Sequence, residues 1–243
     1  DAVTAKLSRD CALLTVMAAN NETGVINDIH QIVSAARVEA PNAVLHSDCA
    51  QVIGKTQFSF SGSQLDAMTI SGHKFGALPG VGALVVRSEI DVKPWLLGGP
   101  QEGKLRAGTE NVLGILETLD RRTTAMQNAR DTFERALRAA VPDITINGAE
   151  ISRLPNTSSV TIPGIRADDL VVAADLQGIL ISSGAACSSG KPEPSHVLLA
   201  MRRSDDAVRA TIRVSFRADH STECASRAAH VLTSLITRMR SSN

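Results

Sequence analysis

The chain has 243 residues, enough for one large domain or two smaller ones. Apolar residues make up 43% of it and aromatic residues only 2%, so its core must consist mainly of aliphatic side chains and alanine. Lys and Arg total 25, as do Asp and Glu, and this balance argues against a nucleic-acid-binding or membrane-surface protein. No apolar run approaches the length of a membrane span.

Cysteine usage sets an expectation for the compartment. The four cysteines are too few and too scattered for a disulfide framework or a CxxC metal site; they are Cys11, Cys49, Cys187 and Cys224. We therefore expect a reducing, cytoplasmic compartment and no bound metal. No signal-peptide pattern follows Asp1, and a buried strand comes so early that the chain is expected to begin partway through a domain.

Short apolar runs predict four strands in the first half, at 13–17, 43–46, 67–70 and 81–86. A helix follows the first strand, with a cap at Asn27 or Asp28, an end near Pro41, and an apolar stripe made by Ile29, Ile32, Val33 and Ala36. This alternation predicts an α/β fold with a mostly parallel sheet. In such sheets, ligands bind beyond the carboxyl ends of the strands.

Polar residues follow three of the predicted strands: Asn21 after the first, Asp48 and Gln51 after the second, and Ser71, His73 and Lys74 after the third. If these strands are neighbours, the polar residues converge on one crevice. A lysine at the end of a buried strand is costly as an ammonium, so we expect it to be paired, shifted in pKa or covalently used. The alternatives are a lysine that reaches to water, a helix cap at Asp48 and a structural histidine at position 73.

The lysine and the aspartate together indicate a specific cofactor. An amine can form a Schiff base with an aldehyde, and a carboxylate can keep a pyridine nitrogen protonated. This is the pair that pyridoxal phosphate requires.

The second half predicts a smaller α+β unit. A long helix through Met126 to about Ala140 leads to strands at 160–162 and 179–181, a helix at 167–176, a strand at 212–215 and a last helix through 228–239. The breaker-rich stretch 182–194 is expected to be a mobile loop. It carries Cys187, which is either a nucleophile or an incidental small residue. Thr109 or Asn111 is expected to cap a helix from about 112. Arg213 suits a carboxylate ligand or a surface ion pair.

Three motifs occur in the order seen in cysteine desulfurases: Asn20-Asn21-Glu22-Thr23-Gly24, His46-Ser47-Asp48-Cys49-Ala50-Gln51 and Ser71-Gly72-His73-Lys74. The chain resembles this group, in the class V aminotransferase branch of fold type I pyridoxal phosphate enzymes, from about Leu13 to Ser215. Later stretches are similar too: Arg106-Ala107-Gly108-Thr109, the six residues that end at Cys187 with Pro194-Ser195-His196 beyond them, and Arg213-Val214-Ser215.

The resemblance implies an α/β/α domain with a mostly parallel sheet that binds pyridoxal 5'-phosphate, of which residues 1–126 are the C-terminal part. Residues 127–243 would form a small α+β domain that carries the catalytic cysteine. By the resemblance, Lys74 forms a Schiff base with the cofactor, Asp48 pairs with its pyridinium nitrogen, and Gln51 and Asn21 donate hydrogen bonds to its ring oxygen. Ser71 and His73 contact the phosphate, and Thr109 contacts the phosphate of the neighbouring subunit in a homodimer. Arg213 and Asn21 bind the substrate.

The implied activity converts L-cysteine to L-alanine and leaves a persulfide on Cys187. Its sulfur would pass to an acceptor or iron–sulfur scaffold protein. A selenocysteine lyase, another class V transaminase, or a non-catalytic scaffold of the same fold remain alternatives.

The sequence departs from the family pattern in two ways. The family's phosphate loop and ring-stacking histidine, which lie N-terminal in longer chains, are not found here, so we expect either a fragment or a degenerate copy. Met201-Arg202-Arg203 and Phe216-Arg217-Ala218-Asp219 also replace stretches in which the family usually has a glycine. These changes bear on the turns next to Arg213.

Overall fold

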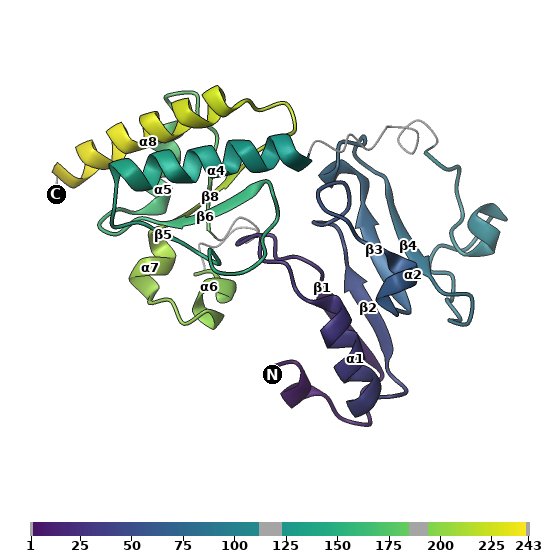
Figure 1. The fold of residues 1–243 in the computed structure, drawn as a ribbon. Coiled ribbons are helices and arrows are strands. Elements are labelled where there is room, and N and C mark those ends of the chain that lie inside the picture. The colour runs from purple at the N-terminus through teal and green to yellow at the C-terminus, as the bar shows by residue number, and fades with distance from the viewer. Residues whose placement is uncertain (1, 112–122, 185–193, 242–243) are drawn as a thin grey trace. The chain divides into compact units, whose positions relative to one another are not determined.

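The computed structural model describes residues 2–111, 123–184 and 194–241 (Figure 1). The chain divides into two compact units. The first unit consists of Asp1–Ala19 and Asn27–Asp120, and the second of Asn20–Ile26 and Arg121–Asn243. The seven residues from Asn20 to Ile26 therefore belong to the second unit, although the first unit surrounds them in the sequence.

The first unit contains a four-stranded sheet in the order β1-β2-β3-β4. Its strands are β1 (Leu13–Met17), β2 (Val44–Asp48), β3 (Ala67–Ser71) and β4 (Gly82–Val86). β1, β2 and β3 run parallel, with Met17 opposite Asp48 and Asp48 opposite Thr69. β4 runs antiparallel to β3, so the carboxyl ends of only the first three strands share one edge of the sheet. We call this the strand-end edge.

Helix α1 (Ile29–Glu39) confirms the predicted apolar stripe, because Ile29, Val33 and Ala36 are buried. Asp28 is its N-cap, and the carboxylate of Asp28 accepts a hydrogen bond from Gln31 N at 3.0 Å. The shorter helical elements of this unit, which the sequence pattern did not predict, are η1 (Thr4–Lys6), α2 (Phe60–Ser63), η2 (Gly72–Lys74) and η3 (Gln101–Lys104).

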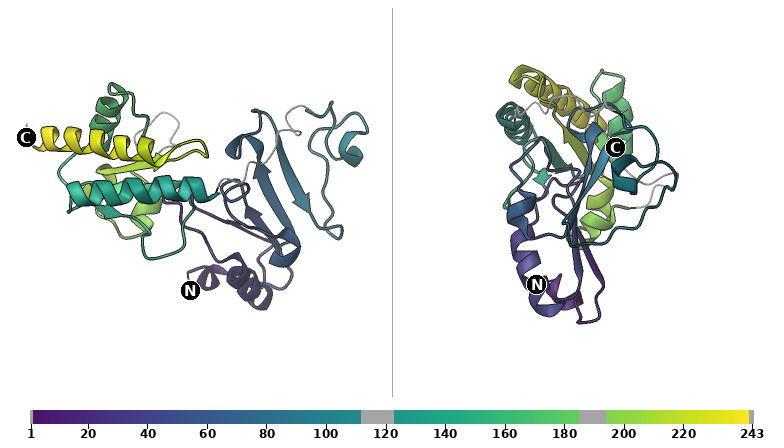
Figure 2. Two further views of the ribbon diagram at one scale, coloured as in Figure 1. Left: turned by 45° about the horizontal axis from the view of Figure 1, so that its top comes forward. Right: turned by 90° about the vertical axis from the view of Figure 1, so that its right-hand side faces the viewer.

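The second unit is an antiparallel sheet in the order β5-β6-β8-β7, covered by long helices. Its strands are β5 (Thr145–Ile146), β6 (Thr157–Thr161), β7 (Ser182–Ser183) and β8 (Thr211–Ser215). Helices α4 (Thr123–Ala140) and α8 (Thr222–Ser241) lie side by side against it (Figures 1 and 2). The remaining helices are α5 (Ala167–Asp175), α6 (His196–Ala200) and α7 (Asp205–Arg209).

The core of the second unit lies between this helix pair and the sheet. Phe133 of α4, Ile212 of β8 and Leu232 of α8 are fully buried in it. Phe216 packs against Phe133 with ring centroids 5.6 Å apart, which adds an aromatic contact to an otherwise aliphatic core. None of the described helices is long and apolar enough to cross a membrane.

One predicted strand is wrong. The apolar residues 179–181 form no strand, and β7 begins only at Ser182. Gly178 has a positive φ of 73°, and Ile179 N donates to Ala174 O, so the chain is still closing the end of α5 at this point. Leu180 is 82% exposed, which shows that an apolar run was here mistaken for a buried strand. The structure does not describe residues 112–122, where a helix was predicted to begin at about 112.

Candidate active site

The strand-end edge of the first unit brings together residues from two motifs. Asp48 is the last residue of β2, and Ser71 is the last residue of β3. These strands are parallel neighbours, and Cys49 N donates to Thr69 O at 2.9 Å directly beyond the last paired residues. Parallel pairing therefore places the Asp48 motif and the Ser71–Lys74 motif at the same edge.

Lys74 lies in a tight 3-10 turn, η2, that begins directly after β3. Gly72 N donates to Val81 O at 2.9 Å, and Gly72 O accepts from Phe75 N and Ala77 N. A Cβ atom at position 72 would lie 3.0 Å from Val81 O and 3.0 Å from Ala77 Cβ, which is tighter than most Cβ contacts in proteins. A side chain at position 72 would therefore require the backbone at Val81 or the side chain of Ala77 to shift.

Lys74 reaches the surface, as in the alternative that the sequence left open. Its side chain is exposed, as is that of His73, because the 3-10 turn carries both residues beyond the end of the strand. Within the described parts of the chain, no hydrogen bond or ion pair engages the Lys74 amine. Ser71 Oγ and His73 Nδ1 are 3.0 Å apart, so a hydrogen bond joins the two residues predicted to contact the phosphate.

The turn after β2 arranges Asp48 and Gln51. Asp48 Oδ1 accepts a hydrogen bond from Ala50 N at 2.9 Å. Gln51 Oε1 accepts one from Lys55 Nζ at 3.0 Å, and Lys55 is only 7% exposed. Lys55 was not singled out from the sequence, although its spacing of four residues from Gln51 was a readable signal.

Cys49 is fully buried between these two residues in the sequence. Burial raises the pKa of the Cys49 thiol from 9.0 to about 11; a hydrogen bond with Ser47 opposes this rise, and the charge of Asp48 adds to it. Cys49 therefore stays a neutral thiol at physiological pH, which agrees with the structural role expected for it.

In the second unit, Arg213 of β8 contacts the turn that carries Asn21. Arg213 Nη1 donates to Asn21 O at 3.1 Å, and Nη2 donates to Ser182 Oγ at 3.4 Å. Its Nε is buried and has no hydrogen-bond partner among the described residues. A guanidinium with an unused buried donor retains capacity for an acceptor such as a carboxylate.

The turn from Asn20 to Gly24 is itself rigidly tied. Asn20 Oδ1 accepts hydrogen bonds from Glu22 N and Thr23 N, both at 2.9 Å. The buried carboxylate of Glu22 accepts a hydrogen bond from the hydroxyl of Ser195, which is also buried and which caps helix α6. The sequence placed Glu22 in a motif but gave no sign that Ser195, 173 residues away, is its partner.

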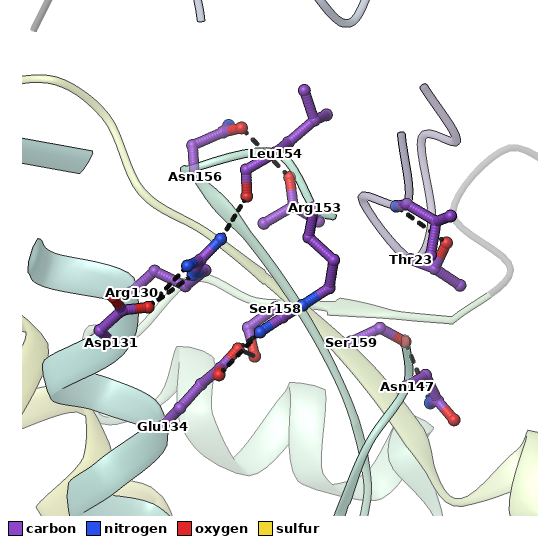
Figure 3. Close-up of polar contacts among 12 residues, drawn as sticks. Thr23, Arg130, Asp131, Glu134, Asn147, Arg153, Leu154, Asn156, Ser158 and Ser159 are labelled. Atoms are coloured by element: carbon purple, nitrogen blue, oxygen red, sulfur yellow. Dashed lines mark hydrogen bonds and ion pairs between the residues drawn. The ribbon is translucent and has the colours of Figure 1, made fainter. Parts of the chain in front are cut away.

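A polar cluster connects α4 to the loop that holds this turn (Figure 3). Glu134 accepts two hydrogen bonds from Arg153, at 2.8 and 3.0 Å, and a third from Ser158 Oγ at 2.7 Å. Arg130 Nη1 donates to Leu154 O at 2.6 Å, and Leu154 N donates to Gly24 O at 2.7 Å. These contacts fix the loop on one side to α4 and on the other to the Asn20–Gly24 turn.

Two predicted site residues cannot be placed with the others. Thr109 is exposed and lies in no helix, and the helix that it was expected to cap falls outside the described residues. Cys187 also lies outside them. The turn next to Arg213 is described: Arg202 adopts a positive φ of 59°, the conformation that usually favours glycine, while β8 pairs regularly through Arg213.

Comparison with solved structures identifies the class of fold. A NifS-like protein superposes with a TM-score of 0.85 at 28% identity, over 98% of this chain and 64% of that one. The structure titled "SspA in complex with cysteine" has a TM-score of 0.71 at 28% identity, over 88% and 61% of the two chains. The fold is that of the fold type I pyridoxal phosphate enzymes, which confirms the predicted α/β class.

Sequence comparison identifies the family. Residues 1–225 match the model of aminotransferase class V, so the chain belongs to this pyridoxal phosphate-dependent family. A cysteine desulfurase of Trichormus azollae is 38% identical over 254 residues, which cover 99% of this chain and 62% of that protein. A putative cysteine desulfurase of Bacillus subtilis is 33% identical, over 96% of this chain and 64% of that protein. The chain thus spans about three fifths of the length of the curated relatives that it matches.

The residues at the strand-end edge fit the cofactor of this family. Asp48 Oδ2 and the amide nitrogen of Gln51 have no hydrogen-bond partners among the described residues, as is also true of the Lys74 amine. A free carboxylate oxygen can pair with the pyridinium nitrogen of the cofactor, and a free amide donor can bind its ring oxyanion. A free amine at the same edge can react with its aldehyde.

Proposed function

We propose that this chain carries the cofactor-binding lysine and the sulfur-accepting cysteine of a pyridoxal phosphate-dependent cysteine desulfurase. The observation that carries the proposal is that Asp48 ends β2 while Lys74 lies in the turn directly after β3, the parallel neighbour of β2. The similarity to cysteine desulfurases along 99% of the chain supports the same activity. Residues 1–126 would be the C-terminal part of the cofactor-binding domain, and residues 127–243 the small domain with the cysteine.

The chain's own residues would divide the work as follows. Lys74 would hold the cofactor aldehyde through its amine, Asp48 would keep the ring nitrogen protonated, and Gln51 and Asn21 would donate to the ring oxygen. Ser71, His73 and, across a dimer, Thr109 would contact the phosphate. When bound, the cofactor supplies an electron sink for the substrate's α-carbon.

Arg213 would bind the carboxylate of L-cysteine, with Asn21 as a second substrate contact; one of the similar solved structures is titled as a complex with cysteine. Cys187 would then attack the substrate sulfur as a thiolate. A sulfur–sulfur bond forms while the carbon–sulfur bond breaks, and its electron pair stays with the carbon skeleton, which takes up a proton and leaves as alanine. The persulfide on Cys187 would be passed to a sulfur acceptor or an iron–sulfur scaffold protein.

We further propose a homodimer in the cytoplasm. The segment before Thr109 exposes large apolar side chains, with Trp95 at 94% and Leu97 at 82%, and a second copy could cover this surface. The three described cysteines are all free thiols, as expected for a reducing compartment.

The test begins with the purified chain and added pyridoxal phosphate. We expect a yellow bound form that disappears in Lys74→Ala and persists in Lys93→Ala, a control at an exposed lysine of the same unit. We expect release of sulfide and alanine from L-cysteine with a reductant, which Cys187→Ser abolishes and Cys224→Ser leaves intact. A chain that binds no cofactor would favour the scaffold alternative. Alanine formation from selenocysteine, but not cysteine, that survives Cys187→Ser would favour the selenium enzyme.

A further inference from the structure

Lys55 is a buried cation that contacts a residue of the proposed cofactor site but was assigned no role. It is 7% exposed, and its Nζ lies 3.0 Å from Gln51 Oε1. A buried ammonium is costly unless it is hydrogen-bonded, and this contact satisfies one donor of Lys55 and the side-chain oxygen of Gln51.

The backbone between the two residues makes the contact possible. Val52 N donates to Cys49 O, while Lys55 N and Thr56 N both donate to Val52 O, so this stretch is coiled into helical turns. Side chains four residues apart are neighbours on such a coil. The contact is therefore built into the local fold of the segment that follows Asp48.

The chemistry of lysine fixes which way the Gln51 amide points. An ammonium can only donate hydrogen bonds, so the Gln51 atom that faces Lys55 must be the carbonyl oxygen. The amide nitrogen then faces away from Lys55, and none of the described residues accepts a hydrogen bond from it. The group of Gln51 that remains without a partner among the described residues, and can be offered to a ligand, is consequently its NH2 donor.

We propose that Lys55 is a positioning residue that makes Gln51 an obligate hydrogen-bond donor to an anionic ring oxygen of the ligand. The inference rests on the cofactor site of the proposed function. An amide free to rotate by 180° could present either its oxygen or its nitrogen, and the oxygen would repel an oxyanion. Lys55 excludes that orientation, and the proximity of its charge polarises the amide toward stronger donation. The ionised form of the ring hydroxyl is thereby favoured over the neutral form.

The test compares Lys55→Met, which removes the donor, with Lys55→Arg, which keeps one. Affinity for pyridoxal phosphate is measured by equilibrium dialysis, and the pKa of the ring hydroxyl is measured from the absorbance of the bound cofactor against pH. We expect Lys55→Met to weaken binding about 10-fold, the effect of one hydrogen bond, and to raise the pKa of the bound ring hydroxyl. Lys55→Arg should retain most of the wild-type affinity and pKa.

A double-mutant cycle separates positioning from a direct or structural effect. If Lys55 acts through Gln51, then Lys55→Met should have almost no further effect on affinity in a Gln51→Ala background. An equal effect in both backgrounds, or no effect of Lys55→Met in a wild type that binds the cofactor, would overturn the inference alone. A wild type that binds no cofactor at all would refute the proposed function, and this inference with it. The melting temperature of the cofactor-free variants monitors folding, and we expect little change because methionine suits a buried position.

Discussion

Cys49 lies next to Asp48 and has no exposed surface. Its reactivity therefore tests whether the turn after β2 excludes solvent from the thiol. Because burial raises its pKa to about 11, the thiolate fraction at pH 8 should be about 100-fold below that of a free thiol with a pKa of 9.0. We expect alkylation of Cys49 by iodoacetamide to be slower than for a free cysteine by at least this factor. Peptide mass spectrometry after timed labelling measures the rate.

Cys224 is the internal control, because its side chain is exposed and should be labelled rapidly. The pKa shift also has a consequence for stability. The folded state holds the proton more tightly than the unfolded state, so this contribution is complete below pH 9 and is lost as the pH rises toward 11. Rapid labelling of Cys49 in the folded protein at pH 8 would show that the turn opens readily.

Helix α6 has five residues and depends on its cap, which makes it the best element on which to test the second unit's polar contacts. Ser195 Oγ accepts a hydrogen bond from Leu198 N at 3.1 Å and donates to the buried Glu22 carboxylate. Ser195→Ala removes the cap and leaves a buried carboxylate without this donor. We expect a loss of about 2–3 kcal/mol in the free energy of unfolding, measured in urea.

Ser204 provides a matched control at the next helix. Its hydroxyl accepts from Ala207 N at 3.3 Å to cap α7, a helix of equal length, but Ser204 is exposed and bonds to no carboxylate in the described parts of the chain. Ser204→Ala should cost only about 0.5–1 kcal/mol. If the two variants lost the same stability, the contact between Ser195 and Glu22 would contribute nothing beyond capping.

At the level of elements, the sequence predicted features that depend on spacing within one segment, and it missed features that depend on how distant segments pair. The stripe of α1 and the cap at Asp28 follow from spacing within one segment, and both are confirmed. The antiparallel direction of β4 was not predicted, although the connection 72–81 is short for a parallel crossover and favours an antiparallel neighbour. Residues 179–181 were wrongly assigned as a strand, since their backbone completes the end of α5 instead.

In the candidate site, too, some features could be predicted from the sequence and others could not. The strand-end positions of Asp48, Ser71 and Lys74 could be predicted because parallel strands share an edge. The contact between Lys55 and Gln51 was readable from their spacing of four residues, but the burial of Lys55 was not, and Glu22 meets Ser195, 173 residues away, only through the fold. The exposed position of Lys74 depends on a 3-10 turn whose closure requires atoms of residues 77 and 81.

Across the whole molecule, buried side chains are distributed unevenly between the two units. Of the twelve largest fully buried side chains among the described residues, nine lie in the second unit and three, Leu45, Val33 and Val52, in the first. Each such side chain contributes about 1.5–3 kcal/mol relative to exposure, so the second unit should be the more stable of the two. We expect the amides of β6 and β8 to exchange at least about 100-fold more slowly than those of β2 and β3 in native-state hydrogen exchange.

A core variant in each unit gives this prediction its control. Leu232→Ala should cost about 2–5 kcal/mol, because Leu232 is fully buried in the core of the second unit, and should speed exchange in β6 and β8. Leu45→Ala should act in the opposite way, speeding exchange in β2 and β3 while β8 keeps its protection. If either variant accelerated exchange equally in both units, they would unfold as one cooperative body. Added cofactor would then protect β8 as strongly as β3, whereas two separate units predict that protection is gained mainly around Asp48 and Lys74.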